Sequence, residues 1–177
     1  MTIEALRDQL PDFAKDIRLN ISSVLKEDAA SGLKLNQIHG IALASAYATK
    51  HAGVIAAFEA ETAAVLSEAE INAARGAATV MAMNNVYYRF VHLVSDQDYS
   101  KLPAGLRMNM IGAPGIEKVD FELYSLAVSA MNGCGMCMDA HVAQAEKHGI
   151  TKQGVQQTIK IGAVVAALAQ ALVIAKL

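Results

Sequence analysis

The segment "FELYSLAVSAMNGCGMCMDAH", residues 121–141, contains both cysteines of the chain and the strongest helix-breaking pair in its C-terminal half. Small and apolar residues recur on either side of Asn132-Gly133 with helical spacing, and no run alternates as a strand would. We therefore predict one helix over about residues 118–131, a break at Asn132-Gly133, and a second helix over about residues 134–148.

The same helical periodicity runs through the whole chain, which predicts an all-α fold. A length of 177 residues suits one domain with a sizeable core. We expect a single helical domain over residues 1–177, with an N-terminal helical half over 1–115 and a redox-active half over 116–177. Further helices are predicted over about residues 2–10, 12–25, 35–50, 54–66, 68–94 and 152–175, with a short one in "GLRMNM".

Caps and breaks set several of these boundaries. Thr2 and Thr151 are predicted to cap the helices that follow them, and Ser67 with Glu70 is typical of a capping box. Gly53 is the expected break between the helices over 35–50 and 54–66. The helix over 12–25 is expected to have an apolar face that consists of Phe13, Ile17, Ile21 and Val24.

Two segments, residues 42–61 and 127–146, suggest a degenerate internal repeat. Both end in Ala-Glu and lead to a Ser or Thr cap before a long helix rich in small residues. Few positions are identical, so alanine-rich helical patterning alone is the alternative explanation. In a true repeat, Thr49, Ala52 and Ala56 would correspond to Cys134, Cys137 and His141.

Composition and charge exclude several classes of function. The net charge is −2 and no run of like charges occurs, which argues against nucleic-acid binding. The N-terminus lacks the basic and apolar regions of a signal peptide. The apolar uncharged stretch over residues 161–175 is shorter than the roughly 20 residues that span a bilayer. We expect a cytoplasmic protein without a membrane segment, where a Cys-x-x-Cys motif is more often catalytic or metal-binding than structural.

Helical spacing places Cys134, Cys137 and His141 on one stripe of the predicted helix, because positions three and four apart share a face. Cys134 falls in the first turn, where free N–H groups and the helix dipole stabilise a thiolate. His141 lies one turn beyond Cys137 and can take the proton of its thiol. Two thiols with a base nearby are typical of a redox centre.

Other interpretations of the cysteines remain. A structural zinc site within one chain needs four ligands, one more than this cluster offers. Two inert buried cysteines are also possible, because free cysteine is often buried. Haem attachment requires histidine directly after the second cysteine, where Met138 stands, and a thioredoxin-type site requires strands.

The opening segment, together with "GLRMNMIGAPGI" and the earlier "MNNVYYRF", resembles the AhpD family of alkyl hydroperoxide reductases, which belongs to the carboxymuconolactone decarboxylase-like group. The resemblance covers essentially the whole chain. It implies an AhpD-like all-helical fold that assembles as a homo-oligomer, a trimer or hexamer. It also implies antioxidant reduction of organic hydroperoxides and of an oxidised AhpC-type peroxiredoxin partner, with electrons from a lipoyl-bearing or other dithiol protein and no bound cofactor or metal.

Roles for four residues follow from the same resemblance. Cys137 would be oxidised to sulfenic acid, Cys134 would resolve it to a Cys134–Cys137 disulfide, and Glu122 with His141 would form a proton relay. The helix dipole favours Cys134 as the thiolate, but pairing of Cys137 with a base can outweigh a dipole effect of roughly 0.3–1 kcal/mol. Relatives often have histidine where this chain has Met136, so one supporting proton carrier is absent here.

Glu122 lies eleven residues before Gly133 and His141 lies eight residues after it. If the two helices fold back on each other at Gly133, the offset of three residues is about 4.5 Å, which a Glu side chain or one water can bridge. The remaining histidines have no matching pattern and are expected at the surface or in hydrogen bonds; they are His39, His51, His92 and His148.

Two rival functions are retained. One is a decarboxylase-like enzyme of the same fold that uses acid–base chemistry alone, which leaves the cysteines without a task. The other is a non-enzymatic helical oligomer whose Cys-Cys-His cluster binds a metal ion.

Overall fold

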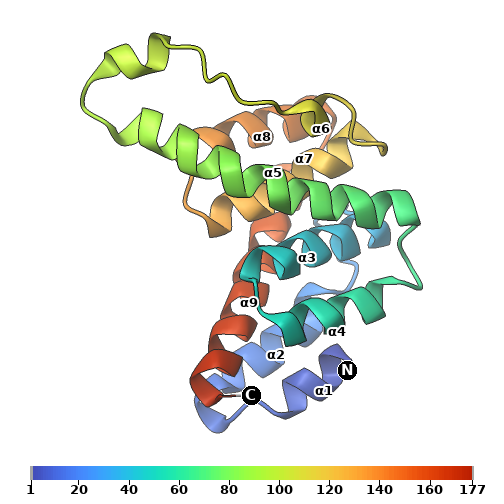
Figure 1. The fold of residues 1–177 in the computed structure, drawn as a ribbon. Helices are drawn as coiled ribbons and strands as arrows, with labels where there is room; N and C mark the ends of the chain where they lie inside the picture. Colours follow the sequence, from blue (N-terminus) through green and yellow to red (C-terminus); the bar gives the residue numbers. More distant parts are fainter. Residues whose placement is uncertain (1, 177) are drawn as a thin grey trace.

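The computed structural model describes residues 2–176, and every regular element in that range is helical (Figure 1). The all-α prediction is therefore confirmed. The α-helices are α1 (Ile3–Asp8), α2 (Lys15–Val24), α3 (Leu35–Thr49), α4 (Ala52–Thr62), α5 (Glu68–Leu93), α6 (Asn109–Gly112), α7 (Lys118–Met131), α8 (Gly135–Lys147) and α9 (Lys152–Ala175), and the 3₁₀ helices are η1 (Asp12–Ala14) and η2 (Gln97–Lys101).

Helix α7 is the centre of the molecule. It packs against α3, α5, α8 and α9, and every residue from Asp120 to Ser129 is buried. A helix that is apolar on all sides must be covered on all sides, which explains why four helices surround it. The two predicted halves of the chain therefore share one packed interior, because α3 and α5 come from the first half and α7 and α9 from the second.

Small residues bring these helices close together. Alanine is the commonest residue on the buried faces of α3 and α5, and Gly40 of α3 lies directly against the Tyr124 ring of α7. A Cβ atom at Gly40 would overlap that ring. The high alanine content of the sequence thus serves close helix packing around α7.

Several helix starts follow their predicted caps. Ser67 and Glu70 form a reciprocal capping box at the start of α5, with the Ser67 hydroxyl accepting the Glu70 N–H. Thr2 and Thr151 cap α1 and α9 by accepting the N–H groups of Ala5 and Gly154. These side chains satisfy backbone donors that the first turn of a helix leaves free.

Other boundaries differ from the prediction. The expected helix over residues 12–25 is split into η1 and α2, and Phe13, expected on its apolar face, is 62% exposed. Helix α3 ends because Lys50 adopts a left-handed conformation, and His51 then caps α4. Gly53, the predicted break, lies inside α4. The short helix expected in "GLRMNM" begins later, at Asn109.

The long connection between α5 and α7 approaches the end of the bundle where α8 packs on α5. After η2 the chain returns along α5 to α6 (Figure 1). α6 itself packs on α5. This route places Met108 and Ile111 beside residues of α5 and α8.

Helix α9 is long and apolar enough to cross a membrane when judged by length and composition alone. The core helix of a soluble protein passes the same test, and α9 packs against α2, α3 and α7. Its most apolar window is nevertheless only 44% buried within one chain.

Candidate active site

The turn between α7 and α8 positions both cysteines. α7 ends at Met131, Asn132 follows as its cap, and Gly133 has a φ of 68°. A side chain is strained at such a φ, so glycine allows the chain to reverse here. The backbone N–H of Cys134 then donates to the carbonyl of Ser129 at 3.1 Å, and the chain enters α8.

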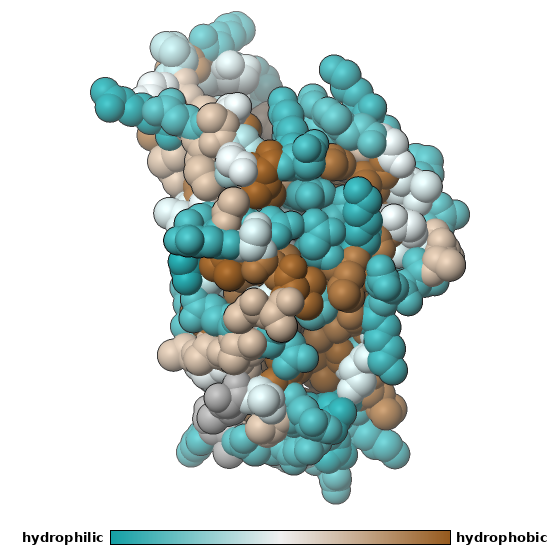
Figure 2. Space-filling model, turned by 90° about the vertical axis from the view of Figure 1, so that its right-hand side faces the viewer, coloured by the Kyte–Doolittle hydropathy of each residue, from teal (hydrophilic) through white to brown (hydrophobic). Residues whose placement is uncertain are grey.

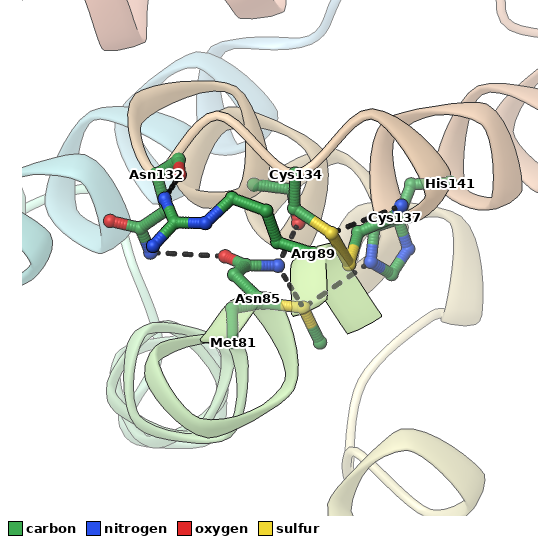
Figure 3. The surroundings of a disulfide bond; sticks show 8 residues. Met81, Asn85, Arg89, Asn132, Cys134, Cys137 and His141 are labelled. Atoms are coloured by element: carbon green, nitrogen blue, oxygen red, sulfur yellow. Dashed lines mark hydrogen bonds between the residues drawn. A yellow bond between two sulfur atoms is a disulfide. The ribbon is translucent and has the colours of Figure 1, made fainter. Parts of the chain in front are cut away.

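Cys134 and Cys137 are joined by a disulfide (Figure 3). Cys134 lies one residue before α8, at its N-cap, and its sulfur accepts the backbone N–H of Cys137 at 3.3 Å. Cys134 is fully buried, whereas Cys137 is 7% exposed and lines a groove. A molecule that enters this groove therefore meets Cys137, with Cys134 behind it.

Glu122 and His141 are in direct contact. The Glu122 Oε2 atom lies 2.6 Å from Nδ1 of His141, and the two side chains are only 4% and 10% exposed. α7 supplies the carboxylate and α8 the ring, so the fold-back at Gly133 brings them together. A buried carboxylate requires a hydrogen-bonding partner, and the imidazole is the partner that this one has.

The pairing fixes the orientation of the imidazole ring. An ionised carboxylate can only accept a hydrogen bond, so the Nδ1–H group is the donor in this pair and Nε2 is the nitrogen left for proton exchange. Nε2 lies 3.3 Å from the sulfur of Met81 on α5. The ring is thus held between two helices, with its basic nitrogen next to a weakly interacting thioether.

A groove of about 510 Å³ opens at this point. Cys137, Glu122 and His141 line it together, and helices α5 to α8 all contribute to its walls. Most of the remaining lining is apolar and consists of Met81, Tyr88, Met108, Ile111 and Met136. Met136, at the position where relatives often have histidine, is 37% exposed. The groove therefore combines a sulfur, an acid–base pair and an apolar wall.

A hydrogen-bond network supports the turn behind the disulfide (Figure 3). Arg89 donates to the carbonyl oxygen of Asn132 at 2.7 Å. The Asn132 side chain donates to Asn85 at 3.0 Å, and Asn85 donates to the Ser129 hydroxyl at 3.0 Å. These contacts fasten the segment immediately before Cys134 to α5.

The structure brings together all four residues predicted from the sequence, with Glu122, Cys137 and His141 on the groove and Cys134 behind it. Sequence reasoning did not identify the contribution of α5. The segment "MNNVYYRF", residues 83–90, supported only the family resemblance. Helical spacing nevertheless puts its Asn84 and Tyr88 on one stripe with the preceding Met81, and all three line the groove.

The other histidines lie outside this cluster. His51 accepts the Val54 N–H as the cap of α4, and His148 contacts the Gln144 carbonyl. Within residues 2–176, no group of three or more His, Cys, Asp or Glu side chains is arranged to hold a metal ion.

Comparison with known proteins gives two consistent results. Residues 97–177 match the model of the carboxymuconolactone decarboxylase family. Over nearly the whole chain, the sequence is similar to proteins named alkyl hydroperoxide reductase AhpD.

Three such relatives illustrate the similarity. One from Coxiella burnetii (strain RSA 493 / Nine Mile phase I) is 52% identical, with 97% of both chains covered. One from Hyphomonas neptunium is 55% identical over 97% of this chain and 94% of the relative. One from Azorhizobium caulinodans is 52% identical over 97% and 93%, respectively.

Proposed function

Because the chain belongs to the AhpD family of alkyl hydroperoxide reductases, we propose that it reduces organic hydroperoxides through a dithiol–disulfide cycle of Cys134 and Cys137. One observation carries the residue roles. Of the two sulfurs, only that of Cys137 belongs to a residue lining the groove, which also holds the Glu122–His141 pair.

In the first step, the Cys137 thiolate attacks the terminal oxygen of the hydroperoxide. An S–O bond forms, the O–O bond breaks, and the products are Cys137 sulfenic acid and an alcohol. His141 takes the thiol proton on Nε2 and returns it to the departing alkoxide, while Glu122 holds Nδ1.

In the second step, the Cys134 thiol attacks the sulfenic sulfur of Cys137, which forms the disulfide and releases water. The Cα atoms of the two cysteines are 5.3 Å apart, within the usual range for a disulfide. An external dithiol then reduces the disulfide and returns both thiols. It has access to Cys137 through the groove, so Cys137 is the sulfur that we expect it to attack.

We further propose a lipoyl-bearing protein as the dithiol donor and an AhpC-type peroxiredoxin as a partner whose oxidised form is also reduced. The reaction as written needs no bound cofactor, because thiols supply both electrons. We place the protein in the cytoplasm, where the glutathione and thioredoxin pools keep thiols reduced.

The rival functions have less support. An acid–base enzyme of the same fold could use Glu122 and His141, but it leaves the disulfide at the groove without a role. A metal site would need a further ligand that the described residues do not bring to this cluster.

Turnover of an organic hydroperoxide with a small dithiol as reductant tests the roles. Cys137→Ser should abolish turnover. Cys134→Ser should also stop the cycle but accumulate a sulfenic acid on Cys137, which a sulfenic-acid trapping reagent would label. Normal turnover by Cys137→Ser would overturn the assignment. So would a sulfenic-acid label on Cys134 in the Cys137→Ser variant together with no label on Cys137 in the Cys134→Ser variant.

A further inference from the structure

Two consecutive asparagines of α5, Asn84 and Asn85, differ sharply in their hydrogen bonds. Both are buried, with 4% and 1% exposure. Both polar atoms of the Asn85 side chain have partners: Nδ2 donates to the Ser129 hydroxyl and Oδ1 accepts from Asn132, each at 3.0 Å. The Oδ1 atom of Asn84 is buried and has no hydrogen-bond partner among residues 2–176. Buried amides without partners are costly, so such a residue calls for a reason beyond packing.

The surroundings of Asn84 supply that reason. Asn84 lines the groove that also contains Cys137, Glu122 and His141. It follows Met81 by one helical turn, and the Met81 sulfur lies 3.3 Å from the basic nitrogen of His141. The unpartnered amide is therefore on the α5 wall of the groove, across from the reactive groups of α7 and α8.

We propose that the Asn84 side-chain amide donates a hydrogen bond to the alkyl-bearing peroxide oxygen of the substrate. The proposal rests on the peroxidase function described above and adds a substrate-contacting residue to it. Because the Oδ1 atom has almost no accessible surface, the contact with the substrate is made by the Nδ2–H group of this groove-lining residue.

The contact gains strength as the reaction proceeds. The Cys137 thiolate bonds to the terminal oxygen while the O–O bond breaks, so negative charge develops on the alkyl-bearing oxygen. The Nδ2–H group stabilises that charge until His141 delivers the proton that completes the alcohol. The electrons come from the Cys137 sulfur, which is oxidised from thiolate to sulfenic acid.

The part of the groove next to Asn84 fits the alkyl part of the substrate, whereas Lys118 and Gln144 are polar side chains elsewhere in its lining. Tyr88 lies one turn beyond Asn84 on α5, and Met108 and Ile111 approach from the segment around α6. These side chains give the wall beside Asn84 an apolar character, which suits an organic hydroperoxide better than hydrogen peroxide.

Asn84→Leu and Asn84→Ala test the proposal, with Asn85→Leu as the matched control for stability. The rate of Cys137 oxidation is measured by mixing the reduced protein rapidly with cumene hydroperoxide. Both Asn84 variants should react roughly 10²-fold more slowly than the wild type, the scale for losing one donor to a developing oxyanion. Asn84→Ala removes the amide without filling the groove, so a loss in both variants excludes simple blockage.

Thermal unfolding supplies a second readout. Asn84→Leu should unfold at the same temperature as the wild type or a higher one, because it replaces an unpartnered buried amide with an apolar side chain. Asn85→Leu should unfold at least about 3 °C lower, because it breaks a satisfied network. Reduction of the disulfide by dithiothreitol should be unchanged in Asn84→Ala, since no peroxide takes part.

The outcomes separate this proposal from the function on which it rests. A wild-type protein that reacts with cumene hydroperoxide no faster than a free thiol would refute the peroxidase function itself. A fast wild type with equally fast Asn84→Leu and Asn84→Ala variants would overturn only the role of Asn84. A marked loss of stability in Asn84→Leu would also overturn it, because the amide would then be serving the fold.

Discussion

At the scale of the residue, Glu122 is a buried carboxylate whose position is unfavourable for the stability of the fold. It lies in the middle of the central apolar helix, 3% exposed, and its one charged or polar partner in the described residues is His141. Burial of a charge in such a place is unfavourable unless it is paired. We therefore propose that this carboxylate has a chemical role, which is to hold the His141 ring.

Replacing Glu122 tests this interpretation. Glu122→Ala should slow hydroperoxide reduction by roughly 10²-fold or more, because the ring loses the group that orients it for proton transfer. Glu122→Gln, which keeps an oxygen that can accept the Nδ1–H bond, should lose less activity. Steady-state turnover measures the effect, and far-ultraviolet circular dichroism checks that both variants remain helical. An Ala variant with the wild-type rate would show that the relay does not operate.

Asp120, near the start of α7, allows a prediction about pH. Burial raises the pKa of the Asp120 carboxyl, although the side-chain amide of Gln37, 2.6 Å away, partly opposes this. The Asp120 carboxyl thus binds its proton more tightly in the folded state than in the unfolded state. Its contribution to stability therefore falls as the pH rises from the pKa of Asp120 in the unfolded chain to its higher pKa in the folded protein.

Asp120→Asn should therefore increase the stability of the protein at neutral pH, and the gain should vanish in acid once the wild-type carboxyl is protonated. Urea unfolding at several pH values measures it. A gain that is independent of pH, or a loss of stability at neutral pH only, would contradict this account of Asp120.

The sequence allowed the Glu122–His141 pair to be located but not the residues that complete the groove. Glu122 and His141 lie at similar distances along the chain from Gly133, so folding the two helices back at that residue brings them together. Despite the offset of three residues, the two side chains are in direct contact and need no bridging water. Met81 and Asn84 come from α5, far away in the chain, and their place depends on how α5 crosses α7 and α8. No local pattern encodes that crossing.

At the scale of the element, helix boundaries were predicted well where a residue type strongly favours one position at a helix end. The break after α7 lies at Gly133, which has a positive φ, and α5 begins after a Ser67–Glu70 capping box. The end of α3 was predicted to within one residue, but the break was expected at Gly53. The observed break uses Lys50, which adopts the left-handed conformation without glycine, and His51, which is an unusual cap for α4.

The close crossing of α3 and α7 depends on glycine at position 40, which has no side chain to collide with Tyr124. Gly40→Ala should lower the free energy of unfolding by about 1–3 kcal/mol or more, because the new methyl group overlaps the fully buried Tyr124 ring. Gly112→Ala is the matched control, since nothing lies within 4 Å of a Cβ atom there. Chemical denaturation should show a change of no more than about 1 kcal/mol for this control. Equal effects of the two substitutions would mean that α3 and α7 do not pack as described.

At the scale of the whole molecule, one chain leaves apolar surface uncovered. Figure 2 shows hydrophobic side chains gathered across the middle of one face, between more hydrophilic ends. Fewer than half of the residues in the most apolar window of α9 are buried, and Val173 and Ile174 near its end are 59% and 58% exposed. Exposed apolar surface of this kind is typical of contacts between protein chains. We propose that the chain, as a single domain, assembles with copies of itself.

The expected assembly is a trimer or hexamer. Light scattering at micromolar concentration should give a mass near three or six times the 18.7 kDa of one chain. A species of 18.7 kDa alone would refute the assembly, whereas the chemistry of the groove would be unaffected, because all of its residues come from one chain.

The central claim is that Cys134 and Cys137 cycle between two thiols and one disulfide when a hydroperoxide is reduced. The most direct test is mass spectrometry of the fully reduced protein before and after one equivalent of organic hydroperoxide. The account predicts a loss of two mass units on the peptide that contains both cysteines, with one equivalent of alcohol formed. An unchanged peptide mass, or oxidation located elsewhere in the chain, would contradict it.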